Sequence, residues 1–423
     1  MNKMVLISVV TVLSLQATEL SELFRALKTK PITQVDRIAI DIAKLQKKRV
    51  EDSFYPDFNL FASYEYYNRD TNLRPVPPPE ANRLIAKKEP LPFAKNIQRI
   101  GASFSVPLFV KKLFTLRKKL DFLIEAAKLK KDLNIYKNEA ILLGSYANLN
   151  YLKELEIALN ARKRSLLKTF EDTKIKVESG RAAPIALDKI ETFLDGLDIA
   201  LENVKTNEAK AKEVIESLTG MHIDSIQPIV QKQEIERKDL FALKLFDQKI
   251  EAQAKDVEAA KDEFVPKLIL QGNYSKDYAQ NDVMFNKSID TDYGSLALKL
   301  VVPLSKANLT QIEIAKTNLL KEQKQKAQTK LELQAQAKSL QKQLTINMRA
   351  QRIAEEKVQH QRELLKYAKT AYDVGRLTQE EYLRYEEALL NAETNLASLK
   401  AKKWQIIAKL AVLYGNDLER IVE

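Results

Sequence analysis

The fold follows from residues 57–67, which read DFNLFASYEYY. Apolar and aromatic side chains take every second position, and polar side chains take most positions between them, with Phe61 as the exception. This is the period of a β-strand with one apolar face. The same alternation recurs at 99–108, 267–278 and 293–304. Each segment has about ten residues, the length that a tilted strand needs to cross a bilayer, so the sequence predicts four membrane strands.

Two features favour membrane strands over the alternative, a soluble antiparallel sheet with one face on a core. No other element is available to cover a separate soluble sheet. In addition, aromatic side chains suit the boundary between lipid and water, and tyrosines stand at the strand ends as Tyr66, Tyr67, Tyr278 and Tyr293.

Four strands cannot close a barrel by themselves. Bare strand edges in lipid leave backbone groups unpaired, and membrane barrels begin at about eight strands. Three chains with four strands each would complete a barrel of twelve. We therefore expect a homotrimer that contacts the lipid of an outer membrane.

The connection between the first two strands, residues 68–95, contains six prolines. Proline interrupts both helices and strands because it lacks a backbone N–H and fixes φ. The sequence predicts an exposed outer loop here, and a shorter connection between the last two strands.

The chain is predicted to contain two copies of one structural unit. The segment Val106-Pro107-Leu108 matches Val302-Pro303-Leu304, Gly180-Arg181 matches Gly375-Arg376, and Gly220 matches Gly415. The chain has only 9 glycines, so four of them at matched offsets are a specific signal. The predicted organisation is a first repeat at 18–220, a linker at 221–235, a second repeat at 236–415 and a short tail at 416–423.

Each repeat contains a long segment typical of an α-helix. Residues 111–178 have no proline and one glycine, and residues 306–374 have neither. A continuous helix of that length is roughly 100 Å long. Apolar residues recur at steps of four and three, which indicates coiled-coil packing. Gly180 and Gly375 are predicted to mark the tips where each helix reverses, giving a mainly α fold in which a long helical barrel continues the small β part. An ordinary coiled-coil rod is the alternative.

Composition excludes several kinds of chemistry. The chain has no cysteine and two histidines, so thiol, zinc and iron–sulfur sites are not expected. The formal net charge is +12, but lysine and arginine are interleaved with acidic residues and form no basic block for nucleic acid. No phosphate-binding loop or catalytic triad pattern occurs. We expect no catalytic residue, cofactor or metal.

The N-terminus predicts export from the cytoplasm. Lys3 precedes an apolar run from Met4 to Leu15, which is too short for a spanning helix and fits a secretory signal peptide over residues 1–17.

The doubled pattern resembles the TolC-like outer-membrane efflux protein family. The resemblance covers nearly the whole chain and rests on the two strand pairs, the tip motifs around Gly180 and Gly375, and the closing Gly220 and Gly415. It implies a trimer with a twelve-stranded barrel and a periplasmic α-helical barrel. It also implies docking of a periplasmic membrane fusion (adaptor) protein of an inner-membrane pump at the tips, through Gly180, Arg181, Gly375 and Arg376.

The resemblance also implies a gate at the periplasmic tips. Tyr372 matches a family tyrosine three residues before Gly375, and Glu381 stands six residues after it, where the family often has aspartate. Arg384 replaces a further acidic residue, and in the first repeat the nearest carboxylate is Asp188. Three copies of Glu381 near an axis would repel one another and attract cations, while Arg384 would offset that charge or lock the closed state.

The predicted function is the outer-membrane channel of a multi-component efflux or type I secretion system, forming a passive duct from periplasm to exterior without enzymatic activity. The alternative is a soluble periplasmic coiled-coil adaptor or scaffold. Such a protein would carry one helical hairpin and compact β domains rather than two equal copies.

Overall fold

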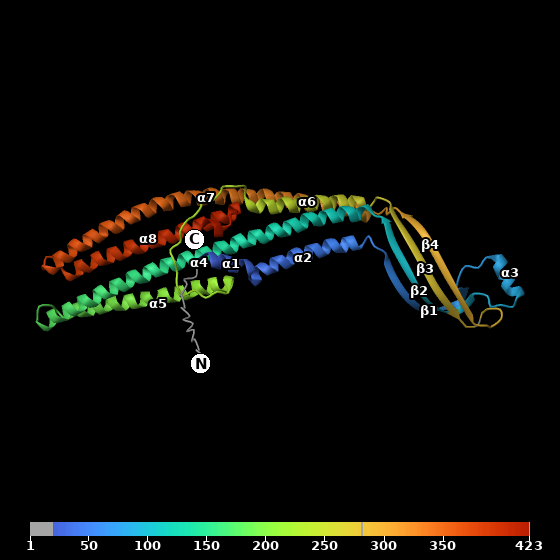
Figure 1. The fold of residues 1–423 in the computed structure, drawn as a ribbon, viewed down its shortest axis with the longest axis horizontal. Helices are drawn as coiled ribbons and strands as arrows, with labels where there is room; N and C mark the ends of the chain where they lie inside the picture. The colour runs from blue at the N-terminus through green and yellow to red at the C-terminus, as the bar shows by residue number, and fades with distance from the viewer. Residues whose placement is uncertain (1–19, 281, 423) are drawn as a thin grey trace, which may run out of the picture. The chain divides into compact units, whose positions relative to one another are not determined.

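A computed structural model describes residues 20–280 and 282–422 of the chain, and the predicted signal peptide lies outside the described residues. The expected fold class, mainly helical with four antiparallel strands, is confirmed (Figure 1). In chain order the elements are α1 (Leu20–Thr29), α2 (Pro31–Asp52), β1 (Asp57–Asn72), α3 (Pro78–Ala86), β2 (Phe93–Phe109), α4 (Lys111–Glu178), α5 (Ile185–Thr219), α6 (Phe241–Asp262), β3 (Lys267–Ala279), β4 (Ile289–Val301), α7 (Lys306–Asp373), α8 (Gln379–Tyr414) and α9 (Leu418–Ile421).

The described chain divides into two compact units. One unit comprises the described residues up to Ile38 together with 128–245 and 326–422, and the other comprises 39–127 and 246–325. Each unit draws on both halves of the sequence, so neither corresponds to one sequence repeat. Among the described helices, none combines the length and apolar character needed to cross a membrane.

The sheet has the simplest antiparallel order, β1-β2-β3-β4. Its register places Asn59, Ser103, Asn273 and Ser295 in one row across the four strands. Because side chains alternate between faces along a strand, that row belongs to a polar face. The neighbouring row, of Leu60, Ala102, Tyr274 and Gly294, belongs to the opposite, apolar face.

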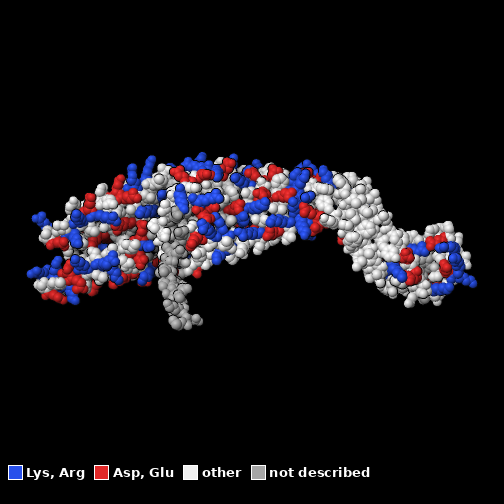
Figure 2. Space-filling view, viewed as in Figure 1, with Lys and Arg blue, Asp and Glu red and all other residues white. Residues whose placement is uncertain are grey.

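Among the described residues, none covers the apolar face of the sheet. Leu60 is 88% exposed and Leu296 is 70% exposed, values that a soluble sheet would not leave across a whole face. Figure 2 shows the visible side of the sheet as a band without acidic or basic residues, bordered by charged residues at both ends of the strands. This is the pattern of a lipid-facing wall.

The pairing of Phe61 with a glycine explains the one break in the alternation of apolar and polar residues. Phe61 lies on the polar face directly opposite Gly101 in the next strand. A Cβ atom on Gly101 would lie 2.6 Å from the Phe61 ring and 2.4 Å from the carbonyl oxygen of Tyr274. On the apolar face Phe104 lies opposite Gly272 in the same way. Each large ring therefore fits because its cross-strand partner has no side chain.

The proline-rich connection differs from the predicted loop. β1 continues to Asn72, β2 begins at Phe93, and the nine-residue helix α3 lies between them. Prolines occupy the first turn of α3, where the missing N–H would have had no helical partner in any case. Proline thus begins this helix instead of preventing it.

In the first of the two units, the short helices α1 and α9 pack against the long helices α4 and α8. Leu23 and Phe24 of α1, Tyr146 of α4 and Ile407 of α8 lie in one buried cluster with Leu418 of α9. The Tyr146 hydroxyl accepts a 2.9 Å hydrogen bond from the backbone N–H of Gln227 in the inter-repeat linker. This cluster fixes the linker, α1 and α9 to the α4 and α8 helices.

A buried carboxylate lies within this part of the unit. Glu139 of α4 is fully buried, 3.2 Å from the Lys28 ammonium of α1, and accepts a 3.1 Å hydrogen bond from the backbone N–H of Leu418. Asp417 and Glu419 also pair with Lys28. Burial, together with the negative charge of Asp417, raises the pKa of Glu139 to about 7, against the opposing effect of Lys28.

The close packing around Gly101 predicts that a side chain at this position destabilises the sheet. Gly101→Ala should destabilise the sheet by about 1–3 kcal/mol because the added carbon overlaps a backbone oxygen as well as a ring. Gly294→Ala is the matched control, since its Cβ would meet its nearest atom at 3.6 Å. The measurement is the temperature at which detergent-solubilised oligomers dissociate on gels. Equal temperatures for both variants would contradict the proposed packing.

The Glu139 environment predicts a pH dependence of stability. A raised folded-state pKa gives stability that is fully present below the unfolded pKa of 4.5 and is lost as pH rises through about 7. Glu139→Gln should therefore gain up to about 3 kcal/mol relative to wild type between about pH 5 and about pH 8. Thermal unfolding at the two pH values measures this difference.

Glu419→Gln is the control for that experiment. Hydrogen bonding to Lys28 lowers the pKa of Glu419, so its contribution is present at neutral pH and is lost in acid. Between about pH 5 and about pH 8 the Glu419 carboxylate stays charged, so Glu419→Gln should be less stable than wild type by the same amount at both pH values. A gain of stability with rising pH in the Glu419→Gln variant as well would exclude the assigned environment of Glu139.

Candidate functional site

The two predicted tips have the same turn geometry. Gly180 has φ +70° and Gly375 has φ +73°, values that favour glycine. At the first tip the N–H of Arg181 donates to Lys176 and that of Gly180 donates to Val177, and at the second tip Arg376 and Gly375 repeat both bonds with Ala371 and Tyr372. This pair of bonds is the Schellman motif, which satisfies carbonyl groups at a helix end. Arg181 and Arg376 are exposed beside these turns.

Glu381 acts as a helix cap in the single chain. Its carboxylate accepts 2.8 Å hydrogen bonds from the backbone N–H and the hydroxyl of Thr378, and its own N–H donates to the Thr378 hydroxyl at 3.2 Å. These bonds form the capping box that begins α8. The hydrogen bond from the Thr378 backbone lowers the pKa of Glu381, so the exposed carboxylate is charged at neutral pH.

Arg384 forms an ion pair within α8 of the single chain. Its guanidinium lies 3.0 Å from Glu380, one helical turn earlier, and both side chains are exposed. Glu380 also lies 3.9 Å from Lys189 of α5, a weak contact between the two hairpins. Asp188, next to Lys189, lies exposed in the first turn of α5.

Tyr372 lies between the two hairpins. Its ring stacks on Tyr382 of α8 with centroids 5.0 Å apart, and the Lys176 ammonium of α4 lies 5.0 Å from its centroid. A cation over an aromatic face is attracted to the ring quadrupole. Tyr372 thus links the end of α7 with both α8 and α4.

A buried ion pair connects the hairpins more firmly. Arg162 of α4 pairs with Glu386 of α8, and the two side chains are only 8% and 6% exposed. Ser165 of α4 also donates to Glu386, Tyr382 donates to it at 2.9 Å, and Arg162 donates to the Leu383 carbonyl at 3.1 Å. Burial lowers the pKa of Arg162 to about 10. We call Arg162, Ser165, Tyr382 and Glu386 the inter-hairpin link.

The predicted gate residues did not include this link, although the sequence carries a signal for it. Arg162 falls between Leu159 and Leu166 at steps of three and four, where a coiled-coil seam normally has apolar residues. Both leucines are buried, so Arg162 occupies a seam position. A polar residue in such a seam often fixes which helices pair.

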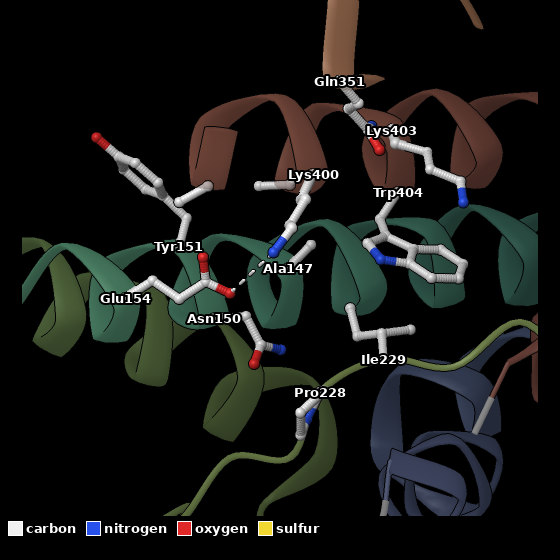
Figure 3. Close-up of a pocket in the computed structure, with 12 residues that line it drawn as sticks. Ala147, Asn150, Tyr151, Glu154, Pro228, Ile229, Gln351, Lys400, Lys403 and Trp404 are labelled. Carbon is white, nitrogen blue, oxygen red and sulfur yellow. Dashed lines mark ion pairs between the residues drawn. The ribbon is translucent and has the colours of Figure 1, made fainter. Parts of the chain in front are cut away.

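Among the hollows along these helices, two are lined by residues of α4, α7 and α8. One, of ≈ 480 Å³, is lined partly by Arg162, Glu386, Arg362 and Lys366. The other, of ≈ 300 Å³, is lined partly by Trp404. Figure 3 shows Lys400 of α8 reaching toward Glu154 of α4 in the second hollow, at 3.9 Å.

Neither hollow shows the features of a reaction centre. The pair in the second hollow is a weak surface ion pair of the kind that joins packed helices. Within residues 20–280 and 282–422, no three His, Cys, Asp or Glu residues are grouped as metal ligands. Both hollows are therefore spaces between packed helices.

The chain is similar to known outer membrane proteins in part of its sequence and in its fold. Residues 233–416 match the family described as "Outer membrane efflux protein". No curated protein matches the chain. Similar solved structures include the CmeC outer membrane channel of Campylobacter jejuni, with a TM-score of 0.75, 16% identity and coverage of 95% of this chain and 85% of that one.

Two further structures have the same fold. VceC, an outer membrane protein of Vibrio cholerae, gives a TM-score of 0.73 at 15% identity and covers 94% of this chain and 96% of its own. The open state of the MtrE channel of Neisseria gonorrhoeae gives 0.73 at 13% identity, with 95% and 90% covered. At such identities the likeness establishes the fold.

Proposed function

We propose that the chain is a non-enzymatic efflux channel of the outer membrane with a periplasmic helical extension, and that three copies form one continuous passive duct. The match of residues 233–416 to the outer membrane efflux protein family and the fold shared with solved outer membrane channels support this proposal. Three copies would supply twelve strands, whereas four strands are too few to close a membrane barrel. The observation that carries the proposal is the uncovered apolar face of a four-stranded sheet whose outer strands, β1 and β4, each have a free edge.

The two repeats, 18–220 and 236–415 with the linker 221–235, would supply alternating hairpins around the helical part of the duct. The α4–α5 and α7–α8 hairpins have the same order of elements and the same tip turns. Gly220 and Gly415 close them with φ +64° and +68°. This equivalence supports a ring in which each chain contributes two similar segments.

The exposed tip residues would bind a periplasmic adaptor protein of an inner-membrane pump. Gly180 and Gly375 allow the turns through their positive φ, and no atom lies within 4 Å of the position of an added Cβ, so the turns are open to a partner. Arg181 and Arg376 present positive charge beside them. We infer that an adaptor with acidic or carbonyl-rich grooves would fit these turns, and that the pump would supply the driving force for export.

The inter-hairpin link would hold the periplasmic end closed. The Arg162–Glu386 pair joins α4 of the first hairpin to α8 of the second, and the Lys176 ammonium of α4 over the Tyr372 ring joins α4 to α7. Separation of the hairpins would cost free energy wherever Arg162 or Glu386 stayed buried without its partner. Glu381, Arg384 and Asp188 would then line the opening end as exposed charges that bias the permeating ions.

The docking proposal predicts loss of export without loss of assembly. Arg181→Glu combined with Arg376→Glu should leave trimers in the outer membrane but abolish ethidium efflux from cells, because the tip charge is reversed. Arg352→Glu is the control, since Arg352 is an exposed arginine of α7 distant in sequence from the tip. If the double variant exports as well as the control, the tips do not dock the adaptor.

The gating proposal predicts a wider channel when the link is weakened. Glu386→Gln should raise single-channel conductance of trimers in planar bilayers because Arg162 loses its charged partner. Glu393→Gln is the matched control, since the pair of Glu393 with Arg362, at 2.8 Å, joins α7 and α8 within one hairpin. Equal conductance of the Glu386 variant and wild type would refute the assigned gate.

A further inference from the structure

The connection between β1 and β2 folds onto the polar face of the sheet. Ile97, Ala279 and Ile289 form one row across β2, β3 and β4. That row is on the same face as the row of Ser63, Arg99, Asp277 and Thr291, two positions along each strand. Leu73, from the beginning of the connection, packs against these residues in a buried cluster with Ala94.

Hydrogen bonds and an ion pair of two arginines hold the connection against the sheet across its width. Arg99 of β2 donates to the carbonyl of Leu73 at 3.0 Å and pairs at 2.9 Å with Asp277 of β3, which is fully buried. Arg74 then reaches β4, where it donates to the Thr291 hydroxyl at 2.8 Å. The segment at 72–74 therefore crosses the polar face from the first strand to the last.

The second half of the connection, from Glu80 to Leu91, is also held in place by polar contacts. Arg74 pairs at 2.7 Å with Glu80 in the first turn of α3. Lys287 of the β3–β4 connection donates to the carbonyl of Lys88 at 2.8 Å, and the backbone N–H of Leu91 donates to Asp282. Leu91 is itself buried. Residues 73–92 thus form an ordered strap, attached to the sheet at both ends and to the neighbouring connection.

The polar face covered by the strap is the one that would line the channel. In a closed barrel the apolar face meets lipid, so the polar face meets the lumen. The strap lies at the ends of the strands opposite those that lead into α2, α4, α6 and α7 (Figure 1). Those helices form the periplasmic extension, so the strap belongs to the outward mouth.

We propose that residues 73–92 form a second constriction, at the outward mouth of the channel, which limits the size of solutes that pass. This inference rests on the proposed trimer, in which three straps would project from the wall into one lumen. The strap is held by ordered contacts at both ends, so the opening is narrowed by a fixed structure and selects by size.

The test uses accessibility from outside intact cells. The chain has no cysteine, so single cysteines can be introduced without background. Ser295→Cys places a thiol on the polar face, in the row of Asn59, Ser103 and Asn273. A small maleimide should label it in the full-length chain, whereas a bulky polyethylene-glycol maleimide should not.

Shortening the strap should remove this difference. Replacing residues 75–90 by a short Gly-Ser turn in the Ser295→Cys chain should allow labelling by both reagents. Arg74→Ala is a milder second variant that keeps the full length but removes the contacts to Thr291 and Glu80, and it should also admit the bulky reagent. Arg83→Ala, at an exposed position of α3, should not.

The outcomes separate the two proposals. If the bulky reagent labels Ser295→Cys in the full-length chain, or fails to label it in both strap variants, the constriction is overturned. Leu296→Cys, on the apolar face, tests the barrel itself and should resist both reagents because lipid covers it. Ready labelling of Leu296→Cys would overturn the proposed barrel whatever the strap does.

Discussion

The structure depends on the unpaired backbone groups along the free edges of β1 and β4. In water such edges hydrogen-bond to solvent, but in hydrocarbon each unpaired N–H or C=O group costs several kcal/mol. The apolar face of the sheet places these edges in lipid, since Leu60 and Leu296 are exposed on it. A single chain cannot satisfy them with its four described strands. In the proposed trimer, pairing of β4 with β1 of the next subunit would satisfy these groups and close the ring.

Closure of the ring also determines what surrounds the polar face. Once the apolar face meets lipid, the row of Asn59, Ser103, Asn273 and Ser295 lines a water-filled lumen. The ordered strap on that face then becomes a constriction. At the helical tips the proposed control of the duct is different, because opening would require separation of the hairpins that the buried Arg162–Glu386 pair joins.

Much of this architecture could be predicted from the sequence because it rests on short-range patterns. Strand alternation at 57–67 reports the two faces directly. The four glycines at matched offsets, Gly180, Gly220, Gly375 and Gly415, all adopt positive φ, which is a local backbone requirement.

Other features depend on contacts between residues distant in sequence. Phe61 breaks the alternation because its partner is Gly101, and only the strand register reveals that pairing. Glu381 is a plausible channel charge by position, yet in the chain its carboxylate caps α8 through Thr378. The strap escaped prediction because proline content indicates a turn but not the face of the sheet on which it packs. Its position is set by Leu73 and Arg74 meeting β2, β3 and β4.

Cross-linking between β1 and β4 tests the central claim most directly. Cysteines at Asn59→Cys and Ser295→Cys, on the polar face of β1 and β4 in a chain that has none of its own, should be joined between subunits by a short flexible thiol cross-linker in outer-membrane preparations. The account predicts covalent dimers and a closed covalent trimer, with no larger species. A chain that remains monomeric in detergent-free buffer and yields no cross-linked product would contradict it.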